Sequence, residues 1–240
     1  MENCLVVMQP TFLPWAGYFN LMAQSNIFVF HDDIQLEKRS WQTRNRLLCG
    51  GKTTWVSVPI RHISESQSIN ETEMLLDTKW RENFRRMFVL NYASHPHFND
   101  ANVVVDQIVE TPWAGVAALN ESINSYIATK LSITSKLYRS IDLPIDGKRT
   151  ESLVKFCEYF SATEYLSPVG AAEYLALDDF VGRAPCKLRF QDFTPQLYPQ
   201  SGQSEFVSHL SILDVLANLG WSKTAGYVRD ECNSRLQAAV

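Results

Sequence analysis

The stretch that decides the fold is CLVVMQPTFLPWAGYFNLMAQSNIFVFHDD, residues 4–33. Residues 4–8 are apolar without alternation, which predicts a strand buried on both faces. Tyr18, Leu21 and Met22 then recur at helical spacing, and IFVFHDDIQ at 27–35 predicts a second strand. A strand, a short helix and a strand within about thirty residues form a βαβ unit, so we expect the two strands to be parallel.

The rest of the chain continues this alternation. Further strands are predicted at 53–60, at 133–141, up to residue 166 and at 187–193, and helices at 77–92, 112–129, 150–160, from about 171, and at 210–219. Asp77 or Thr78 is the expected cap of the helix at 77–92. Because the chain shows no linker or repeat, we expect residues 1–240 to form a single α/β domain, with a mainly parallel, Rossmann-like sheet flanked by helices.

Composition narrows the class of protein. Apolar residues make up 45% of the chain, and the net charge of −4 argues against a general nucleic-acid binder, so DNA is not an expected partner. No basic leader is followed by an apolar core, and no apolar run approaches the roughly 18 residues of a membrane span. The odd number of cysteines, without a CxxC pair, predicts free thiols and a cytoplasmic location. They are Cys4, Cys49, Cys157, Cys186 and Cys232.

Several common catalytic motifs are absent from the sequence. It contains no GxSxG elbow, no HExxH motif, no Walker A loop and no GxGxxG fingerprint, which disfavours P-loop ATP hydrolysis and hydride transfer on a standard dinucleotide fold. His95 and His97 flank a proline and have no adjacent carboxylate partner. We therefore expect neither a metal site nor a resident cofactor.

Polar residues follow the predicted strands, at the edge where ligands bind to open parallel sheets. Gln9 ends the first strand, and His31, Asp32 and Asp33 end the second. Functional interpretations of this second group are a general base, a pair of metal ligands, or acceptors for sugar hydroxyls. The alternative is a loop start in which one aspartate bonds to backbone amides. Ser167 follows a later strand at the same predicted edge.

A basic segment follows the two aspartates. Residues 37–52 contain five cations and one anion, a balance of +4 within a protein of net −4. Arg44 and Arg46 flank Asn45, and Trp41 precedes them, so guanidinium forks and an indole could bind the phosphates and a ring of a nucleotide sugar. The alternative is a solvated loop whose cations pair with the acidic run at 65–77.

The segment QPTFLPWAGYF at 9–19 joins the first strand to the helix. Pro10 and Pro14 fix the turn, and Gly17 is expected to let the helix approach the sheet closely. Trp15 and Tyr18 present aromatic faces that could contact a ligand beside the end of the strand.

Two segments carry a resemblance to a known family. QPTFLPWAGYF at 9–19, followed by DDIQLEKRSWQTRNRL at 32–47, resembles the opening of the WbqC-like family, and the similarity extends over about the whole chain. The motif residues carried over are Gln9, Pro10, Pro14, Trp15, Gly17, Tyr18, Asp32, Asp33, Lys38, Trp41, Arg44, Asn45, Arg46, Ser167 and Gly170. The chain departs from the family where Pro168 and Val169 separate Ser167 from Gly170, in place of an expected Ser-Gly pair.

The resemblance implies a bacterial, cytoplasmic enzyme of surface-polysaccharide (lipopolysaccharide O-antigen or capsule) biosynthesis. It implies an acyl- or aminoacyltransferase, with glycine among the groups transferred, acting on a nucleotide-linked amino sugar. Asp32 or Asp33, with His31, would take the proton of the sugar amine, and the other carried-over polar and aromatic residues would bind substrate. The co-substrate would be a thioester, an acyl phosphate or an aminoacyl-tRNA, and tRNA is expected only as such a donor.

Two alternatives remain open at this stage. The first is a non-catalytic nucleotide-sugar-binding or scaffold protein of the same pathway. The second is a nucleotidyl- or ligase-type enzyme, because the strand–corner–helix–strand opening also resembles nucleotidylyltransferases, although both histidines of their HxGH motif are absent here.

Overall fold

The computed structural model describes residues 3–61, 64, 66–75, 78–200, 203 and 205–230. Its centre is a five-stranded sheet in which every pair of neighbours is parallel, in the order β5-β2-β1-β6-β7. Numbered within this sheet alone, the order is 3-2-1-4-5, that of one half of a Rossmann fold and its first neighbours. The predicted parallel, Rossmann-like α/β sheet is therefore confirmed. The strands are β1 (Cys4–Met8), β2 (Ile27–Phe30), β5 (Lys136–Arg139), β6 (Glu164–Ser167) and β7 (Lys187–Phe190).

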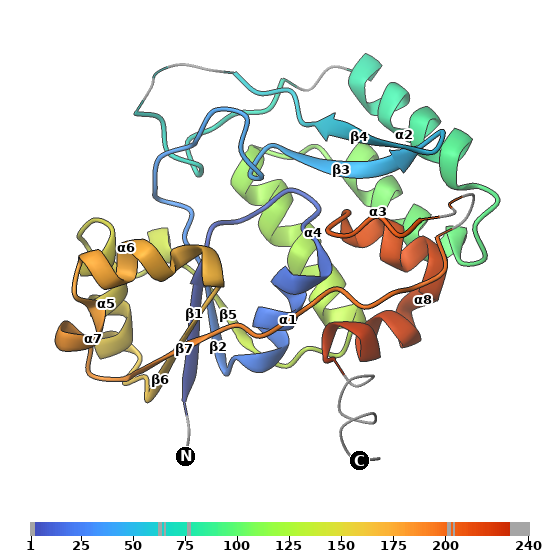
Figure 1. Cartoon of the computed structure of the whole chain (residues 1–240). Helices are drawn as coiled ribbons and strands as arrows, with labels where there is room; N and C mark the ends of the chain where they lie inside the picture. Colours follow the sequence, from blue (N-terminus) through green and yellow to red (C-terminus); the bar gives the residue numbers. More distant parts are fainter. Residues whose placement is uncertain are drawn as a thin grey trace, which may run out of the picture.

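Helices cover both faces of this sheet (Figure 1). One face packs against α1 (Ala16–Gln24), α4 (Val116–Lys130) and α8 (Ile212–Val228), with α2 (Thr78–Tyr92) and α3 (Phe98–Glu110) beyond them. The other packs against α5 (Thr150–Tyr159), α6 (Ala172–Leu177) and α7 (Phe180–Arg183). Short 3-10 turns, η1 (Ser140–Asp142) and η2 (Val169–Ala171), follow β5 and β6.

The two hydrophobic cores explain the apolar run of the first strand. Val6 faces the core shared with α1, α4 and α8, whereas Leu5 and Val7 face the core shared with α5 and α7. Since successive side chains of a strand point to opposite faces, a strand covered on both sides has no polar positions to alternate with.

A separate hairpin, β3 (Arg44–Cys49) and β4 (Lys52–Ser57), lies beyond the carboxyl ends of the parallel strands (Figure 1). The predicted strand at 53–60 therefore exists, but it pairs antiparallel with β3 and not with the main sheet. The strand β3 itself was not predicted, because its outward positions carry arginines that read as a polar loop. Gly50 and Gly51, with φ of 56° and 76°, form the tight turn between the two strands.

The corner after β1 depends on Gly17 for a reason that differs from the predicted one. A Cβ atom at Gly17 would lie 2.1 Å from the indole of Trp15, so the missing side chain makes room for this ring and not for the sheet. The indole then packs against Phe193 and His209, with ring centroids 5.6 and 4.6 Å away. Trp15 is thereby fixed at the start of α1.

Other predictions need correction at particular elements. Helix α3 was not predicted at all, and α8 continues past Gly220, where a kink with φ of 70° replaces the predicted end. Helix α4 begins at Val116, four residues after the proline that was expected to open it. The predicted cap Asp77, and Cys232, lie outside the described residues. The four described cysteines are free thiols, and no helix in the described ranges has the length and apolarity of a membrane span.

Candidate functional site

The carboxyl ends of the five parallel strands meet at one edge of the sheet. Gln9 follows β1, His31 follows β2, and Ser140 follows β5, while β6 ends at Ser167 and Gln191 follows β7. The order of the strands reverses between β1 and β6, and ligands of doubly wound sheets bind outside this reversal. The parallel pairing of the strands therefore brings these residues to the same edge of the sheet, as the sequence predicted.

Asp32 connects two of the strand ends at this edge. Its side chain is 0% exposed, and its Oδ1 accepts hydrogen bonds from Ser140 Oγ at 2.9 Å and from the amide of Ile141 at 3.1 Å. Its Oδ2 accepts from Arg139 Nη2 at 3.0 Å. The carboxylate therefore joins the end of β2 to the end of β5, and it presents no surface to a ligand.

Asp33 and His31 are more accessible than Asp32. The Asp33 side chain is 32% exposed and its Oδ1 bonds with the Ser140 hydroxyl, whose single proton serves one aspartate at a time. His31 Nε2 lies 3.6 Å from the same Oδ1. Burial lowers the pKa of His31, against the opposing charges of Asp33 and Asp32. The imidazole is therefore neutral near pH 7, which suits a proton acceptor beside an orienting carboxylate.

Glu121, on α4, completes this group and was not among the predicted site residues. Its Oε2 lies 2.9 Å from Arg139 Nε, so one guanidinium joins Glu121 to Asp32. Burial, and next the charge of Asp32, raise the pKa of Glu121 to about 8, although Arg139 lowers it. A signal was present in the sequence, because Asn120, Glu121 and Asn124 are polar residues within the predicted apolar helix at 112–129.

Buried amides hold the loop that leaves β1. Asn120 Nδ2 donates to the carbonyls of Pro10 and Gln42 at 3.0 and 2.8 Å, and Asn124 Nδ2 donates to that of Thr11 at 3.0 Å. Gln42 Nε2 donates to Gln9 Oε1 at 2.6 Å. The loop therefore has a fixed shape, and it connects the strand ends to the segment that precedes the hairpin.

The outer face of the hairpin carries the basic residues. Arg44 lies over the Trp55 ring, 4.1 Å from its centroid, and Arg46 lies 5.4 Å from Trp41 and 5.9 Å from Trp55. Among the described residues, neither arginine pairs with a carboxylate, and the Nε atom of each is buried without a hydrogen-bond partner. Arg46 Nη2 donates to the His209 carbonyl at 3.1 Å. Neither arginine makes the alternative pairing with the described part of the acidic run at 65–77.

Other predicted binding residues lie in different surroundings. Asn45 is buried and donates to the Phe12 carbonyl at 3.0 Å, so it holds the loop after β1. Tyr18 is buried too, and its hydroxyl donates to the Gln9 carbonyl at 3.1 Å. Ser167 is fully buried at the end of β6, whereas Gly170 is exposed and would have room for a side chain. Lys38 is exposed in the segment between Asp33 and the hairpin.

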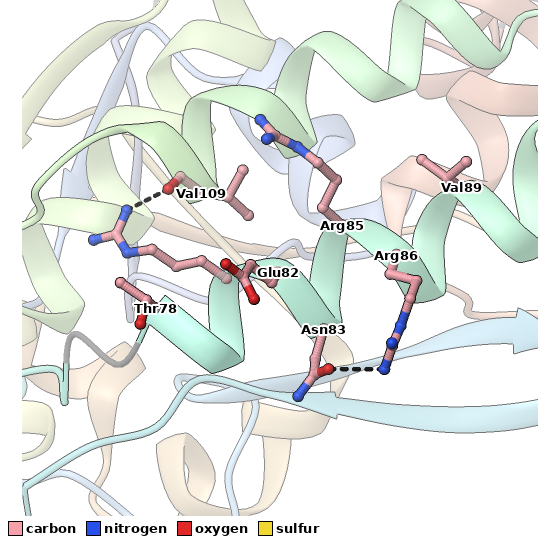
Figure 2. A pocket seen from close by; sticks show the side chains of 8 residues that line it. Thr78, Glu82, Asn83, Arg85, Arg86, Val89 and Val109 are labelled. Carbon is pink, nitrogen blue, oxygen red and sulfur yellow. Dashed lines mark hydrogen bonds between the residues drawn. The ribbon is translucent and has the colours of Figure 1, made fainter.

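An open groove of about 620 Å³ lies elsewhere, along α2 beside α3 (Figure 2). Its arginines already have partners: Arg81 donates to two carbonyls at the end of α3, and Arg85 pairs with Asp106 and Glu110. Figure 2 shows Arg85 and Arg86 pointing in different directions, with Arg86 bonded to Asn83. These contacts hold α2 against α3, and the charged groups of the groove do not point toward a common position that a ligand could occupy.

Fold and site together define a class: a doubly wound α/β protein with an acidic cluster at the carboxyl ends of its strands and an indole–arginine face on a hairpin beyond them. The chain belongs to the WbqC-like protein family, whose model matches residues 9–225. It is 29% identical over 228 residues to the uncharacterized protein Rv1507c of Mycobacterium tuberculosis, across 94% of this chain and 97% of that protein. No solved structure matches the chain significantly.

Proposed function

We propose that this protein is an N-acyl- or aminoacyltransferase, with glycyl transfer included, that acts on a nucleotide-linked amino sugar. The observation that carries this proposal is the separation of charge within one site. The hairpin offers Arg44 and Arg46 without carboxylate partners among the described residues, whereas the strand ends offer Asp33, with Glu121 of α4 beside Arg139. A nucleotide-linked amino sugar has the complementary division, with an anionic diphosphate at one end and a basic amine at the other.

The hairpin face is the proposed site of the nucleotide. The guanidinium groups of Arg44 and Arg46 bind diphosphate oxygens by charge-assisted hydrogen bonds, the strongest that such side chains make. The exposed indoles of Trp41 and Trp55 provide flat surfaces for a base or a sugar ring. In this proposal Trp15 and Lys38 contribute at the margins of the nucleotide site.

The strand ends are the proposed site of the chemistry. As the sugar amine attacks the carbonyl carbon of the donor, a carbon–nitrogen bond forms and the bond to the donor's leaving group breaks. His31 accepts the amine proton, Asp33 stabilises the resulting imidazolium, and Asp32 positions both by tying β2 to β5. Neutral imidazole is available for this role because burial lowers the pKa of His31.

The acyl donor is a second substrate in this proposal, and it would be a thioester, an acyl phosphate or an aminoacyl-tRNA. No resident cofactor is needed, since the donor arrives activated. We place the reaction in the cytoplasm, in the assembly of O-antigen or capsule precursors, because this is what membership of the family suggests for such a substrate.

Mass spectrometry tests the proposed reaction. UDP- and dTDP-linked amino sugars are incubated with the protein and each class of donor, and the expected result is a sugar nucleotide heavier by one acyl or aminoacyl group. His31→Gln should lower kcat strongly with little change in KM, and the matched control Arg86→Ala, on α2, should leave both unchanged. Absence of any product with all donor classes would contradict transfer, and unchanged activity in His31→Gln would remove this residue from the base role.

A binding or scaffold role is the second candidate, and the structure of Asp32 favours it. All side-chain contacts of this residue are internal, as expected for a group that holds geometry without taking part in turnover. Sugar nucleotides that raise Tm but are never converted would support this role. Pyrophosphate release that depends on ATP would instead support a nucleotidyl- or ligase-type enzyme.

A further inference from the structure

His209 lies in the segment before α8, and its contacts place it beside the basic face of the hairpin. The residue is exposed, and its imidazole centroid lies 4.6 Å from that of the Trp15 indole. Its carbonyl accepts a hydrogen bond from Arg46 Nη2 at 3.1 Å. The rings of Trp41 and Trp55 lie 5.4 and 5.9 Å from the same guanidinium. His209 is therefore a direct neighbour of both an indole and an arginine of the proposed nucleotide site.

The backbone beside His209 is held by two other parts of the chain. The amide of Ser211 donates to the Arg46 carbonyl at 2.9 Å, and the amide of Ile212 donates to the Pro14 carbonyl at 2.8 Å. His209 itself has φ of 58°, in the left-handed region that asparagine, aspartate and histidine adopt more often than other residues with side chains. The imidazole therefore extends from a fixed backbone, which reduces the entropy that is lost when it binds a ligand.

Both side chains keep a nitrogen that is available to a ligand. Ser208 Oγ lies 2.9 Å from His209 Nδ1, whereas Nε2 has no hydrogen-bond partner among the described residues. Arg46 binds the His209 carbonyl through Nη2, and its Nη1 forms no hydrogen bond within the described ranges. A guanidinium nitrogen is always a donor, and an imidazole nitrogen becomes one on protonation. The chemistry that fits these two groups is therefore that of an anion with several acceptor oxygens.

The charge of Arg46 also acts on the imidazole. Burial lowers the pKa of His209, and the positive charge of Arg46 lowers it further. Among the described residues, Arg46 of β3 is the charged group that faces this ring from another element, and its other ring neighbour, Trp15, is uncharged. The imidazole of the free protein is therefore neutral near pH 7. An anion beside it would favour the protonated form and raise the pKa by about 1–3 units.

We propose that His209 binds the diphosphate of the sugar nucleotide together with Arg46, and that it takes up one proton from the solvent as it does so. Its Nε2 donates to a phosphate oxygen, while Trp15 packs against the ring. This inference rests on the proposed function for the identity of the ligand. It adds to the residues predicted from sequence a diphosphate-binding side chain whose charge depends on pH, so the affinity of the site should depend on pH as well.

Isothermal titration calorimetry in buffers of different ionisation enthalpy measures the protons that are taken up on binding. The probes are UDP-N-acetylglucosamine and dTDP-glucose, which have no free amine and whose diphosphates do not titrate near pH 7. The wild type should take up a measurable fraction of one proton, and its affinity should fall as the pH rises from about 6.5 to about 8. Binding without proton uptake and without this pH dependence would overturn the proposal.

The variant His209→Asn keeps a residue that adopts the left-handed conformation but removes the titratable ring. It should bind both probes about 10-fold more weakly at pH 6.5 and lose the proton uptake that His209 supplies. The matched control is His97→Asn, at the start of α3 beside Asp100, which should behave as the wild type. Weaker binding of His209→Asn with unchanged proton uptake would indicate a structural role only and would overturn the proposal. His209→Gln replaces this variant if it fails to fold.

Nitrogen-15 NMR of the histidine side chains gives a second readout that a structural role would not change. The titration midpoint of His209, assigned by the loss of its signals in the variant, should lie at least about one pH unit higher with UDP-N-acetylglucosamine than with potassium chloride at matched ionic strength. An unmoved midpoint in the presence of bound ligand would overturn the proposal.

The outcomes separate this inference from the proposed function. If the His209 midpoint rises but no donor yields a product, the diphosphate-binding role of His209 stands and the transferase proposal fails. If a product forms while the His209 midpoint and the proton uptake stay unchanged, the transferase proposal stands and the role of His209 fails. If neither sugar nucleotide binds, both proposals fail.

Discussion

Two charged regions of the proposed site, the strand ends and the hairpin, differ in how their charges are compensated. At the strand ends, Asp32 is fully buried and bound to Arg139, Ser140 and the amide of Ile141. On the hairpin, Arg44 and Arg46 stack on indoles that are 47% (Trp41) and 44% (Trp55) exposed, and no described carboxylate neutralises them.

The Asp32 carboxylate therefore stabilises the fold, whereas the guanidinium groups of Arg44 and Arg46 are the charges that we expect to bind a ligand. Removing the fully buried Asp32 carboxylate leaves its donors unsatisfied and destabilises the protein, whereas removing a half-buried cation that has no carboxylate partner costs the fold less. Substitutions at the strand ends should therefore be measured first as stability, and substitutions on the hairpin as binding.

The largest expected effect is that of Asp32→Ala. The change removes the acceptor of the Ser140 hydroxyl and of the Ile141 amide, and it leaves the half-exposed Arg139 with Glu121 and Asp142, so the free energy of unfolding should fall by about 1–3 kcal/mol. Urea denaturation followed by circular dichroism measures it. The adjacent Asp33→Ala is the matched control and should cost about 1 kcal/mol or less, because this side chain is partly exposed. Equal losses of unfolding free energy in Asp32→Ala and Asp33→Ala would contradict the structural role that we assign to Asp32 alone.

The second prediction concerns the hairpin. The double variant Arg44→Ala, Arg46→Ala should weaken UDP or dTDP binding by about 100-fold, since each charged hydrogen bond contributes about 1.5 kcal/mol. Isothermal titration calorimetry measures the affinity, and the unfolding free energy should change much less than in Asp32→Ala. The surface arginine variant Arg86→Ala, on α2, is the control. Undiminished nucleotide affinity in the double variant would show that the hairpin is not the anion site.

The smallest effect is the pH dependence contributed by His31. Its pKa is lowered by burial, so between the folded value and about 6.5 the unfolded chain binds more protons than the native one. The contribution of neutral His31 is thus complete above about pH 6.5 and is lost as the pH falls below it. The Tm of the wild type should decrease more steeply with acidification than that of His31→Gln. Parallel curves would contradict a buried, neutral imidazole.

The same comparison explains what the sequence could predict. The apolar runs at 4–8 and 27–30 are local signals, and parallel pairing then places Gln9, His31 and Asp32 at one edge without knowledge of any contact. Strand β3 was missed for a local reason, because Arg44 and Arg46 made its sequence resemble a polar loop, and no helix was predicted at residues 98–110.

The partners at the strand ends could not be predicted from local pattern. Glu121 and Arg139 lie 89 and 107 positions after Asp32 in the sequence, and tertiary packing alone brings the three together. Local pattern also does not reveal which polar side chain is buried. Asn45 lies between two outward arginines and points inward because side chains alternate along β3, whereas Asp32 and Asp33 differ in exposure although they are neighbours.

The central claim is that one ligand spans both regions, with its diphosphate on the hairpin and its amine at the strand ends. The most direct test is calorimetric binding of UDP-glucosamine and UDP-N-acetylglucosamine, and of the corresponding dTDP sugars, to the wild type and to the Arg44→Ala, Arg46→Ala variant. The account predicts that the free amine binds at least about 10-fold tighter than its acetylated form, and that both ligands lose affinity in the variant. Equal or tighter binding of the acetylated sugar, or full affinity in the variant, would contradict it.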